Sequence, residues 1–190
     1  EEHALHIWPR GGSMMIALPN PDGSFTCTLF WPLEGPGSFA ALQTGEDVLQ
    51  CFAEMFPDAV SLMPTLTADY FRNPTGTLVT VRSRPWHHRD RVVLLGDACH
   101  AVVPFYGQGA NAAFEDCAVL SDALAAHGDR EAAFARYESL RKPHTDALAD
   151  LSLVNFVEMR DHTASRVFRL TRRLAQQLHR IFPRWIVRPE

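Results

Sequence analysis

The residues best suited to chemistry lie between Gly96 and Asn111. Gly96 and Asp97 come directly after the apolar run 92–95, so a carboxylate follows what the sequence predicts to be a buried strand. Glycine lets the backbone approach a ligand closely, and a carboxylate accepts hydrogen bonds from the hydroxyl groups of a sugar or polyol. Asp97 is therefore a candidate to bind a chain of hydroxyl groups.

A second polar feature follows about ten residues later, where a glycine-flanked turn opens a predicted helix. The N–H groups of Gly109, Ala110 and Asn111 at the start of that helix form a site for negative charge. A ribityl chain on Asp97 and an electron-rich ring edge on the helix start together describe a flavin. The alternative is structural: an Asp that caps a turn, and a helix that is entered through glycines.

The N-terminal part of the chain predicts an antiparallel meander. Residues 5–8, 13–18 and 25–31 are apolar or β-branched runs separated by turn residues. Alternation along a strand puts Met14, Ile16 and Leu18 on one face, and Thr28 with Phe30 opposite Cys27, Leu29 and Trp31. Either face could line a core or a pocket.

Helical patterns fill most of the rest. Thr44 lies three residues before Asp47 and caps a predicted helix over about 45–56, which Pro57 ends. Residues 65–90 are predicted to be extended, with 78–81 the clearest strand. The run 92–95 has no alternation, which favours a strand covered on both faces.

Two long helices and a basic one follow towards the C-terminus. The first covers about 110–126, and Asp129 caps a second that runs to about Arg160 and is expected to break or bend at Pro143. Residues 164–182 predict an amphipathic helix with arginines on its polar side. These elements together indicate an α+β fold.

Composition excludes several classes of protein. The 190 residues are 46% hydrophobic and 21% charged, so the chain can bury a core without disulfides. The net charge of −4 gives no overall reason to bind nucleic acid, although residues 141–190 contain ten Arg or Lys and only five Asp or Glu. No run reaches the ~20 apolar residues of a membrane-spanning helix, and no signal peptide is visible.

The cysteines predict a reducing, cytoplasmic compartment. Cys27, Cys51, Cys99 and Cys117 are spread without the spacing of a disulfide framework or a zinc site. The pairs at 87–88 and 99–100 contain histidines, but no complementary ligand pair is visible in the sequence. We therefore predict no metal.

Residues 35–40 match the glycine pattern of a dinucleotide-binding motif but lack the structural context that the motif needs. Such a motif needs a helix that begins at the glycines, whereas the cap at Thr44 starts the helix several residues later. A plain turn is the better interpretation. No other βαβ unit is visible. Because the chain opens inside a predicted strand, we expect it to be part of a longer protein.

Residues 90–117 resemble the second flavin motif of the single-component FAD-dependent aromatic hydroxylases, the family of para-hydroxybenzoate hydroxylase. Segments 5–10, 14–20, 24–30 and 155–160 add to the resemblance, which covers nearly the whole chain. It implies an α/β parent fold with three parts: a substrate-binding sheet domain with one helix at 1–84, the late part of an FAD-binding domain at 85–127, and C-terminal helices at 128–190.

The same resemblance implies which residues bind FAD. Asp97 would bind ribityl or ribose hydroxyls, and the backbone at 108–111 would bind the pyrimidine edge of the flavin. The implied cofactor-binding set is Gly96, Asp97, Pro104, Gly107, Gln108, Gly109, Ala110 and Asn111.

The implied substrate is a small aromatic amino acid, L-kynurenine, because segment 155–160 and the Met-rich strand narrow the resemblance to the members of this family that hydroxylate kynurenine. Its binding set would be Leu5, Met14, Ile16, Leu18, Thr28, Phe30, Pro104, Phe105, Tyr106, Asn155, Glu158 and Met159. Asn155 is the best candidate to hydrogen-bond the amino-acid end of the substrate. The family commonly has a residue other than Tyr at position 106.

The implied activity is conversion of L-kynurenine to 3-hydroxykynurenine with NADPH and O2, through a flavin C4a-hydroperoxide. The family holds the ADP half of FAD with a βαβ unit, which this chain lacks, so the chain alone is expected to be inactive. Two alternatives stay open: a related hydroxylase of another aromatic acid, such as a hydroxybenzoate or salicylate, and a non-catalytic fragment whose basic helix binds a membrane or a partner.

Overall fold

The computed structural model describes residues 1–162, and these residues form two compact units. Among the described residues, the first unit contains residues 1–76 and 157–162, and the second contains residues 77–156. The predicted amphipathic helix at 164–182 lies outside the described residues. No helix within 1–162 is both long and apolar enough to cross a membrane.

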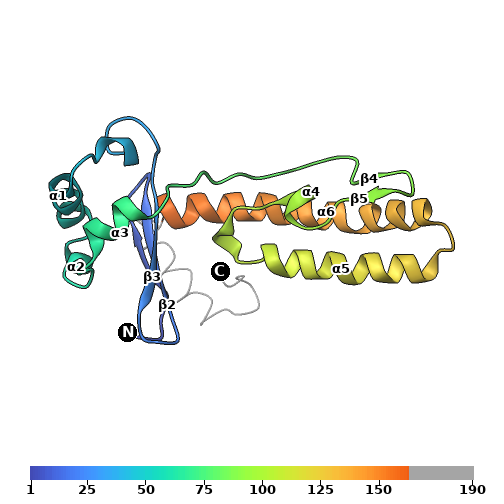
Figure 1. Cartoon of the computed structure of the whole chain (residues 1–190), viewed down its shortest axis with the longest axis horizontal. Coiled ribbons are helices and arrows are strands. Elements are labelled where there is room, and N and C mark those ends of the chain that lie inside the picture. Colours follow the sequence, from blue (N-terminus) through green and yellow to red (C-terminus); the bar gives the residue numbers. More distant parts are fainter. Residues whose placement is uncertain (163–190) are drawn as a thin grey trace, which may run out of the picture. The chain divides into compact units, whose positions relative to one another are not determined.

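The first unit is built on a three-stranded antiparallel sheet (Figure 1). Its strands β1 (His6–Pro9), β2 (Met14–Pro19) and β3 (Phe25–Phe30) pair in chain order, so the predicted meander is confirmed. Glycines in the β1–β2 connection have positive φ, which favours a tight return of the chain. In the register, Ile16 of β2 lies opposite Ile7 of β1 and Thr28 of β3.

Short helices complete this unit: α1 (Gly45–Met55), α2 (Pro57–Val60) and α3 (Leu66–Arg72), preceded by a single 3-10 turn, η1 (Phe39–Ala41). The predicted helix over 45–56 is confirmed, and its cap is the predicted one. The Thr44 side chain accepts a hydrogen bond from the Asp47 N–H, and the Asp47 side chain accepts one from the Thr44 N–H. This reciprocal pair satisfies two N–H groups that a helix start leaves unpaired.

The core of the first unit forms where the helices meet one face of the sheet. Met15 of β2 is only 1% exposed and packs in a cluster of buried apolar side chains from the helical segment: Val48, Phe52, Phe56, Ala59 and Leu66. Since side chains alternate along a strand, Met14, Ile16 and Leu18 lie on the other face.

The expectation of an extended chain over 65–90 is wrong for its first part. Residues 66–72 are helical because Leu66 packs into the core of the first unit, a tertiary contact that a local pattern does not contain. Leu78 and Val79 do not form a strand either: both are exposed, and the chain there is only extended. Within the second unit, this segment is held by the Val81 N–H, which donates to the Ala101 carbonyl over 2.8 Å.

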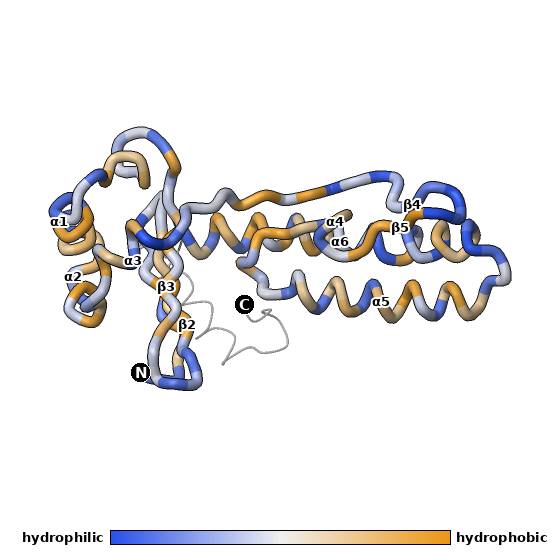
Figure 2. Tube along the Cα trace, in the orientation of Figure 1, coloured by the Kyte–Doolittle hydropathy of each residue, from blue (hydrophilic) through white to orange (hydrophobic). Residues whose placement is uncertain are grey.

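The second unit is dominated by two antiparallel helices, α5 (Gly109–Ala126) and α6 (Arg130–Val157), which lie side by side (Figure 1). Both were predicted, as was the cap at Asp129, whose carboxylate accepts from the Ala132 N–H over 3.0 Å. Shorter elements precede them: β4 (His87–His88), β5 (Val92–Val93), α4 (Asp97–His100) and a 3-10 turn, η2 (Pro104–Tyr106). Apolar and polar residues alternate along α5 in Figure 2, as expected for a helix that buries one side.

The expected break at Pro143 does not occur, because α6 is one continuous helix from Arg130 to Val157. Proline removes one backbone hydrogen bond from a helix interior, but the buried face of α6 continues on both sides of it, while Pro143 itself is exposed. That face contains the buried side chains of Tyr137, Arg141, Thr145 and Ala149. Packing along this face outweighs the lost bond.

The run 92–95 is not a strand covered on both faces. Among the described residues β5 pairs only with the two residues of β4, Val92 is 51% exposed, and the three residues after it are half-buried. The run is continuously apolar because its last three residues pack against a core on one side, not because both faces are covered. Val93, Leu94 and Leu95 pack against a core that contains Trp86 and Tyr137.

We expect Met15→Ala to lower the free energy of unfolding by about 2–5 kcal/mol, because it removes a fully buried side chain and leaves a cavity. Leu62→Ala is the control: Leu62 is 77% exposed, and its truncation is expected to cost under about 0.5 kcal/mol. Urea unfolding followed by circular dichroism measures both. Equal costs for the two variants would contradict the assignment of the core.

Candidate functional site

The turn at Gly96 is built so that only glycine fits well. Gly96 has φ +58°, and a Cβ added there would lie 3.2 Å from the Cβ of Ala113 on α5. It therefore lies against the second turn of α5 while its backbone adopts a conformation that other residues disfavour. Asp97 follows as the first residue of α4 and is exposed. The turn thus presents a carboxylate beside the N-terminal part of α5.

The start of α5 is approached through a second glycine turn. Pro104, Tyr106 and Gln108 are exposed around η2, and Gly107 after it has φ +65° with nothing near its Cβ position. The glycine is thus needed for its backbone angle, not for a close approach. Gln108 precedes α5, and its side-chain carbonyl accepts from the amide of Asn111 over 2.8 Å. The first N–H groups of α5 have no partners within the helix.

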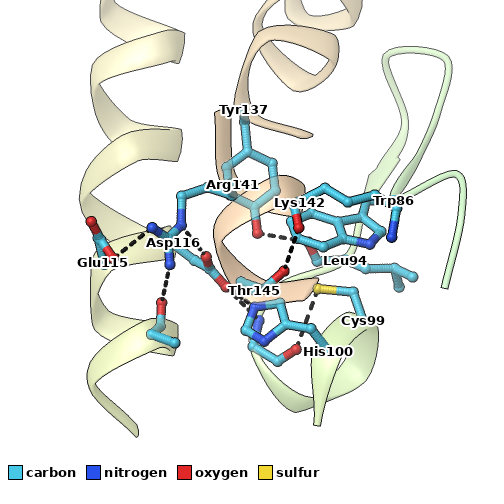
Figure 3. Close-up of polar contacts among 12 residues, drawn as sticks. Trp86, Leu94, Cys99, His100, Glu115, Asp116, Tyr137, Arg141, Lys142 and Thr145 are labelled. Atoms are coloured by element: carbon cyan, nitrogen blue, oxygen red, sulfur yellow. Dashed lines mark hydrogen bonds and ion pairs between the residues drawn. The ribbon is translucent and has the colours of Figure 1, made fainter. Parts of the chain in front are cut away.

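A buried carboxylate joins these two predicted features. Asp116 of α5 is 0% exposed, and its Oδ2 accepts from the Gly96 N–H over 3.1 Å and lies 2.5 Å from Nε2 of His100 (Figure 3). An ionised carboxylate only accepts hydrogen bonds, so Nε2 of His100 carries the hydrogen. The residue before Asp97 and the last residue of α4 are therefore both bonded to α5.

Arg141 of α6 completes the cluster. Its Nε donates to Oδ1 of Asp116 over 2.7 Å, and Nη2 donates to the Ala112 carbonyl over 3.2 Å. Its Nη1 pairs with Glu115 at 2.5 Å, and Arg141 itself is only 3% exposed (Figure 3). One guanidinium thus contacts three residues in the first two turns of α5: Ala112, Glu115 and Asp116.

Electrostatics in the cluster follow from burial and from these bonds. Burial alone would raise the pKa of the Asp116 carboxyl, but hydrogen bonds from His100, Arg141 and the Gly96 N–H outweigh it and lower that pKa below its ordinary value. Asp116 is therefore ionised at neutral pH, and the positive charge of Arg141 balances it.

Two neighbouring groups are made less acidic. Burial, with the Asp116 charge as the next cause, raises the pKa of the Cys99 thiol to about 11, and the same two causes raise the pKa of the Tyr137 hydroxyl. Cys99 Sγ donates to the Gly96 carbonyl over 3.3 Å, and Tyr137 donates to the Leu94 carbonyl over 3.3 Å. A protonated buried thiol is not a nucleophile, so both groups act as hydrogen-bond donors.

Cys99, His100 and Asp116 also place their ligand atoms within 4.8 Å of one another, which is a possible metal site. The sequence did not show this trio because Asp116 reaches it only through the fold. Both oxygens of Asp116 already accept hydrogen bonds, one of them from a guanidinium that would repel a cation. The trio is organised as a hydrogen-bonded cluster, and nothing in its geometry calls for a metal.

Sequence reasoning missed Asp116 and Arg141, although a signal was present. Asp116 falls on the face of α5 that also carries Ala112 and Ala123, and Arg141 falls on the apolar face of the next helix. One acid and one base on facing apolar sides of neighbouring helices indicate a buried ion pair. The prediction was possible only if the two helices were assumed to pack face to face.

Asn155 near the end of α6 has a partner within the protein. Its amide Nδ2 donates to the Phe105 carbonyl over 2.5 Å, and Phe156 stacks on the Phe105 ring with centroids 4.4 Å apart. These contacts fasten η2, the turn beside the predicted flavin edge, to α6. The assigned role of Asn155 in substrate binding stays a prediction.

The α-helix ends at Val157, and Glu158–His162 form one π-helical turn, η3, which lies next to β1 in the first unit. The helix predicted to run to about Arg160 is therefore α-helical only as far as Val157, and Glu158 and Met159 lie in the π-helical turn. Wider π-helical turns are frequent at functional sites. Glu158 and Met159 are half-buried in this turn.

The predicted substrate residues of the sheet share a face. The register pairs Met14 with Phe30 and Ile16 with Thr28, and Leu18 continues the same row. Met14 is fully buried, whereas Leu5, which precedes β1, is 51% exposed. These residues belong to the first unit, and the predicted flavin-binding residues belong to the second.

The chain is similar to a known protein family and to curated proteins. A family model described as an FAD binding domain matches residues 63–152. A kynurenine 3-monooxygenase of Salinispora tropica is 55% identical over 184 residues, which is 96% of this chain and 41% of that protein. One from Dictyostelium discoideum is 48% identical over 204 residues, covering 100% of this chain and 44% of its own length.

Solved structures show the same fold. The FAD and uric acid complex of HpxO from Klebsiella pneumoniae has a TM-score of 0.66 at 24% identity, over 93% of this chain and 44% of that one. The 2-methyl-3-hydroxypyridine-5-carboxylic acid oxygenase has a TM-score of 0.59 at 25% identity, over 80% and 40%.

Residues 63–152 thus match an FAD-binding family model, and almost the whole chain is similar to part of the curated relatives. Its curated relatives at 48–55% identity are named kynurenine 3-monooxygenase, which confirms the resemblance seen in the sequence. The chain spans about two fifths of the length of the curated relatives it matches.

The lowered pKa of Asp116 predicts a pH dependence of stability. Its stabilisation is complete above the unfolded pKa of about 4 and is lost as the pH falls through the lower folded value. We therefore expect the advantage of the wild type over Asp116→Asn in urea midpoint to be constant from pH 7 to 5 and to shrink below about pH 4.

The control for this experiment is Asp122→Asn, an exposed carboxyl on the same helix, whose midpoint is expected to follow the wild type at every pH. A gap between wild type and Asp116→Asn that widens on acidification would contradict the assignment.

Proposed function

We propose that the whole protein to which this chain belongs is an FAD-dependent monooxygenase and that this chain supplies the flavin-ring and substrate side of its active site. The observation that carries the proposal is the Gly96–Asp97 turn, bonded to α5 beside the helix start through Asp116. An exposed carboxylate and a set of helix-start N–H groups are thereby held in the same part of the second unit. Both features lie within the region that matches the FAD-binding family model, which supports the proposal that they bind the flavin.

The proposed FAD-binding residues suit FAD in their polar chemistry and in their exposure to solvent. Asp97, Gln108, Ala110 and Asn111 are exposed and so accessible to a ligand, whereas their supports, Asp116 and Arg141, are buried. In this proposal Asp97 accepts hydrogen bonds from the ribityl or ribose hydroxyls of FAD. The N–H groups of residues 109–111 bind the pyrimidine edge of the flavin ring, where helix-start donors stabilise negative charge.

The bound flavin would supply the redox chemistry and the activation of oxygen. The protein's part is to orient the aromatic ring of the substrate and to exclude water. Pro104 and Tyr106 are exposed on η2, which Asn155 and Phe156 fasten to α6, so this turn is a stable surface for a ring to lie against. Met14, Ile16, Leu18, Thr28 and Phe30 share one face of the sheet in the first unit, and we keep them as proposed substrate-binding residues.

For the substrate we propose L-kynurenine, with NADPH as the source of reducing equivalents. The names of the curated relatives support this choice, at identities near 50% over almost the whole chain. The alternative that best fits the same site is another electron-rich aromatic acid. The cytoplasmic location remains a prediction from the cysteines, all four of which are free.

We expect Asp97→Asn in the whole protein to weaken FAD binding about 10- to 100-fold, because hydrogen bonds to a charged group contribute about 1.5–3 kcal/mol. Asp90→Asn is the matched control, an exposed carboxyl in the turn between β4 and β5, and should leave FAD affinity within about 2-fold. Quenching of flavin fluorescence during titration of the apoprotein measures both. Equal affinities for the two variants would contradict the role of Asp97.

The substrate is tested by product analysis after turnover of the whole protein with NADPH and O2. L-Kynurenine is expected to give 3-hydroxykynurenine, detected by mass spectrometry, while 4-hydroxybenzoate and salicylate stay unchanged. Hydroxylation of either benzoate with none of kynurenine would favour the alternative substrate class. Retained FAD without any hydroxylation would separate cofactor binding from the proposed activity.

A further inference from the structure

We propose that Asp116 and Arg141 are positioning residues for the flavin site, which set where Asp97 stands relative to the start of α5. The proposal rests on the function proposed above, because it concerns how the same site is held in shape. Neither residue is assigned a ligand role. Both act through the backbone that carries the ligand-binding groups.

Asp116 contacts both ends of the short helix α4. Its Oδ2 accepts the N–H of Gly96, the residue immediately before Asp97, and pairs with His100 at the end of the same short helix. A helix of four residues, Asp97–His100, has little stability of its own. Its two ends are therefore placed by one carboxylate of α5. Rotation of that carboxylate would move the Asp97 turn with it.

Arg141 holds the Asp116 carboxylate in one orientation. Arg141 bonds to Asp116, to the Ala112 carbonyl and to Glu115, all within the first two turns of α5. The planar guanidinium presents its donors in a fixed fork, so these three contacts define one orientation. The same two side chains, Asp116 and Arg141, therefore position both the start of α5 at residues 109–111 and the Asp97 turn.

The stability of a folded unit does not require a buried ion pair such as Asp116–Arg141. Removing two charges from water is costly, and replacing a buried ion pair by apolar side chains is often neutral or stabilising. In the first unit, the buried cluster around Met15 and Phe52 consists of apolar side chains. The directional bonds of Asp116 supply what apolar contacts cannot, namely a defined position for one N–H group.

The proposal is tested in the whole protein with a double-mutant cycle on FAD affinity. Arg141→Lys keeps the charge but loses the fork, and we expect it to weaken FAD binding about 10-fold in the wild-type background. In the Asp97→Asn background the same change should weaken binding less than about 3-fold, because the carboxylate that it positions is already lost. Coupling of this kind distinguishes positioning from general destabilisation.

Two further measurements complete the test. Arg82→Lys is the matched control, an Arg to Lys change in the Arg82–Asp150 ion pair of the same unit, and should change FAD affinity less than about 2-fold. Amide hydrogen exchange should show the Gly96 N–H exchanging at least about 10-fold faster in Arg141→Lys than in wild type. Should Arg141→Lys fail to fold, Asp116→Asn, which has the same shape, replaces it in the cycle.

The outcomes separate the two proposals. If Asp97→Asn leaves FAD affinity unchanged, the flavin site itself is wrong and the positioning role falls with it. If Asp97→Asn weakens FAD binding but folded Arg141→Lys binds as wild type does, or the two effects simply add, only the positioning role is overturned. Coupled effects together with faster exchange at Gly96 support it.

Discussion

The buried carboxylate of Asp116 is the interaction on which the second unit depends. It accepts hydrogen bonds from Gly96 and from His100 at the end of α4, and from Arg141 of α6, so two segments far apart in sequence meet at one side chain of α5. Without it, the Gly96 N–H and the His100 ring would be buried donors lacking a partner, at a cost of about 1–3 kcal/mol each. The position of the exposed Asp97 is a consequence of this buried arrangement.

Buried polar contacts of a second kind hold the remaining irregular segments of the unit to α6. Glu138 accepts from the Trp86 N–H over 2.9 Å and lies 2.9 Å from the His87 ring, which fixes the chain before β4. Asn155 does the same for η2. Because these segments have few backbone partners of their own, the long helix serves as the support to which each is bonded.

The two units obtain order by different means. The first has a sheet and a helical layer joined by apolar packing around Met15 and Phe52, and its polar devices are local, such as the Thr44 cap. The second has only two-residue strands, and its turns are placed by side-chain hydrogen bonds to α5 and α6. A surface intended for a polar cofactor needs such directional support, since apolar contact does not fix the direction of a donor or acceptor.

The sequence by itself determined the elements whose patterns are local: the three-stranded meander, the capped helix after Thr44, α5, and the start of α6 at Asp129. It also located Gly96 and Asp97, because a glycine and an acid after an apolar run are recognisable without the fold. Only the tertiary structure decided that residues 66–72 are helical, that α6 continues through Pro143, and that Asp116 and Arg141 join the site. The physical reason is common to all three: each depends on packing or charge pairing between segments distant in sequence, and a local pattern contains no information about which face meets which partner.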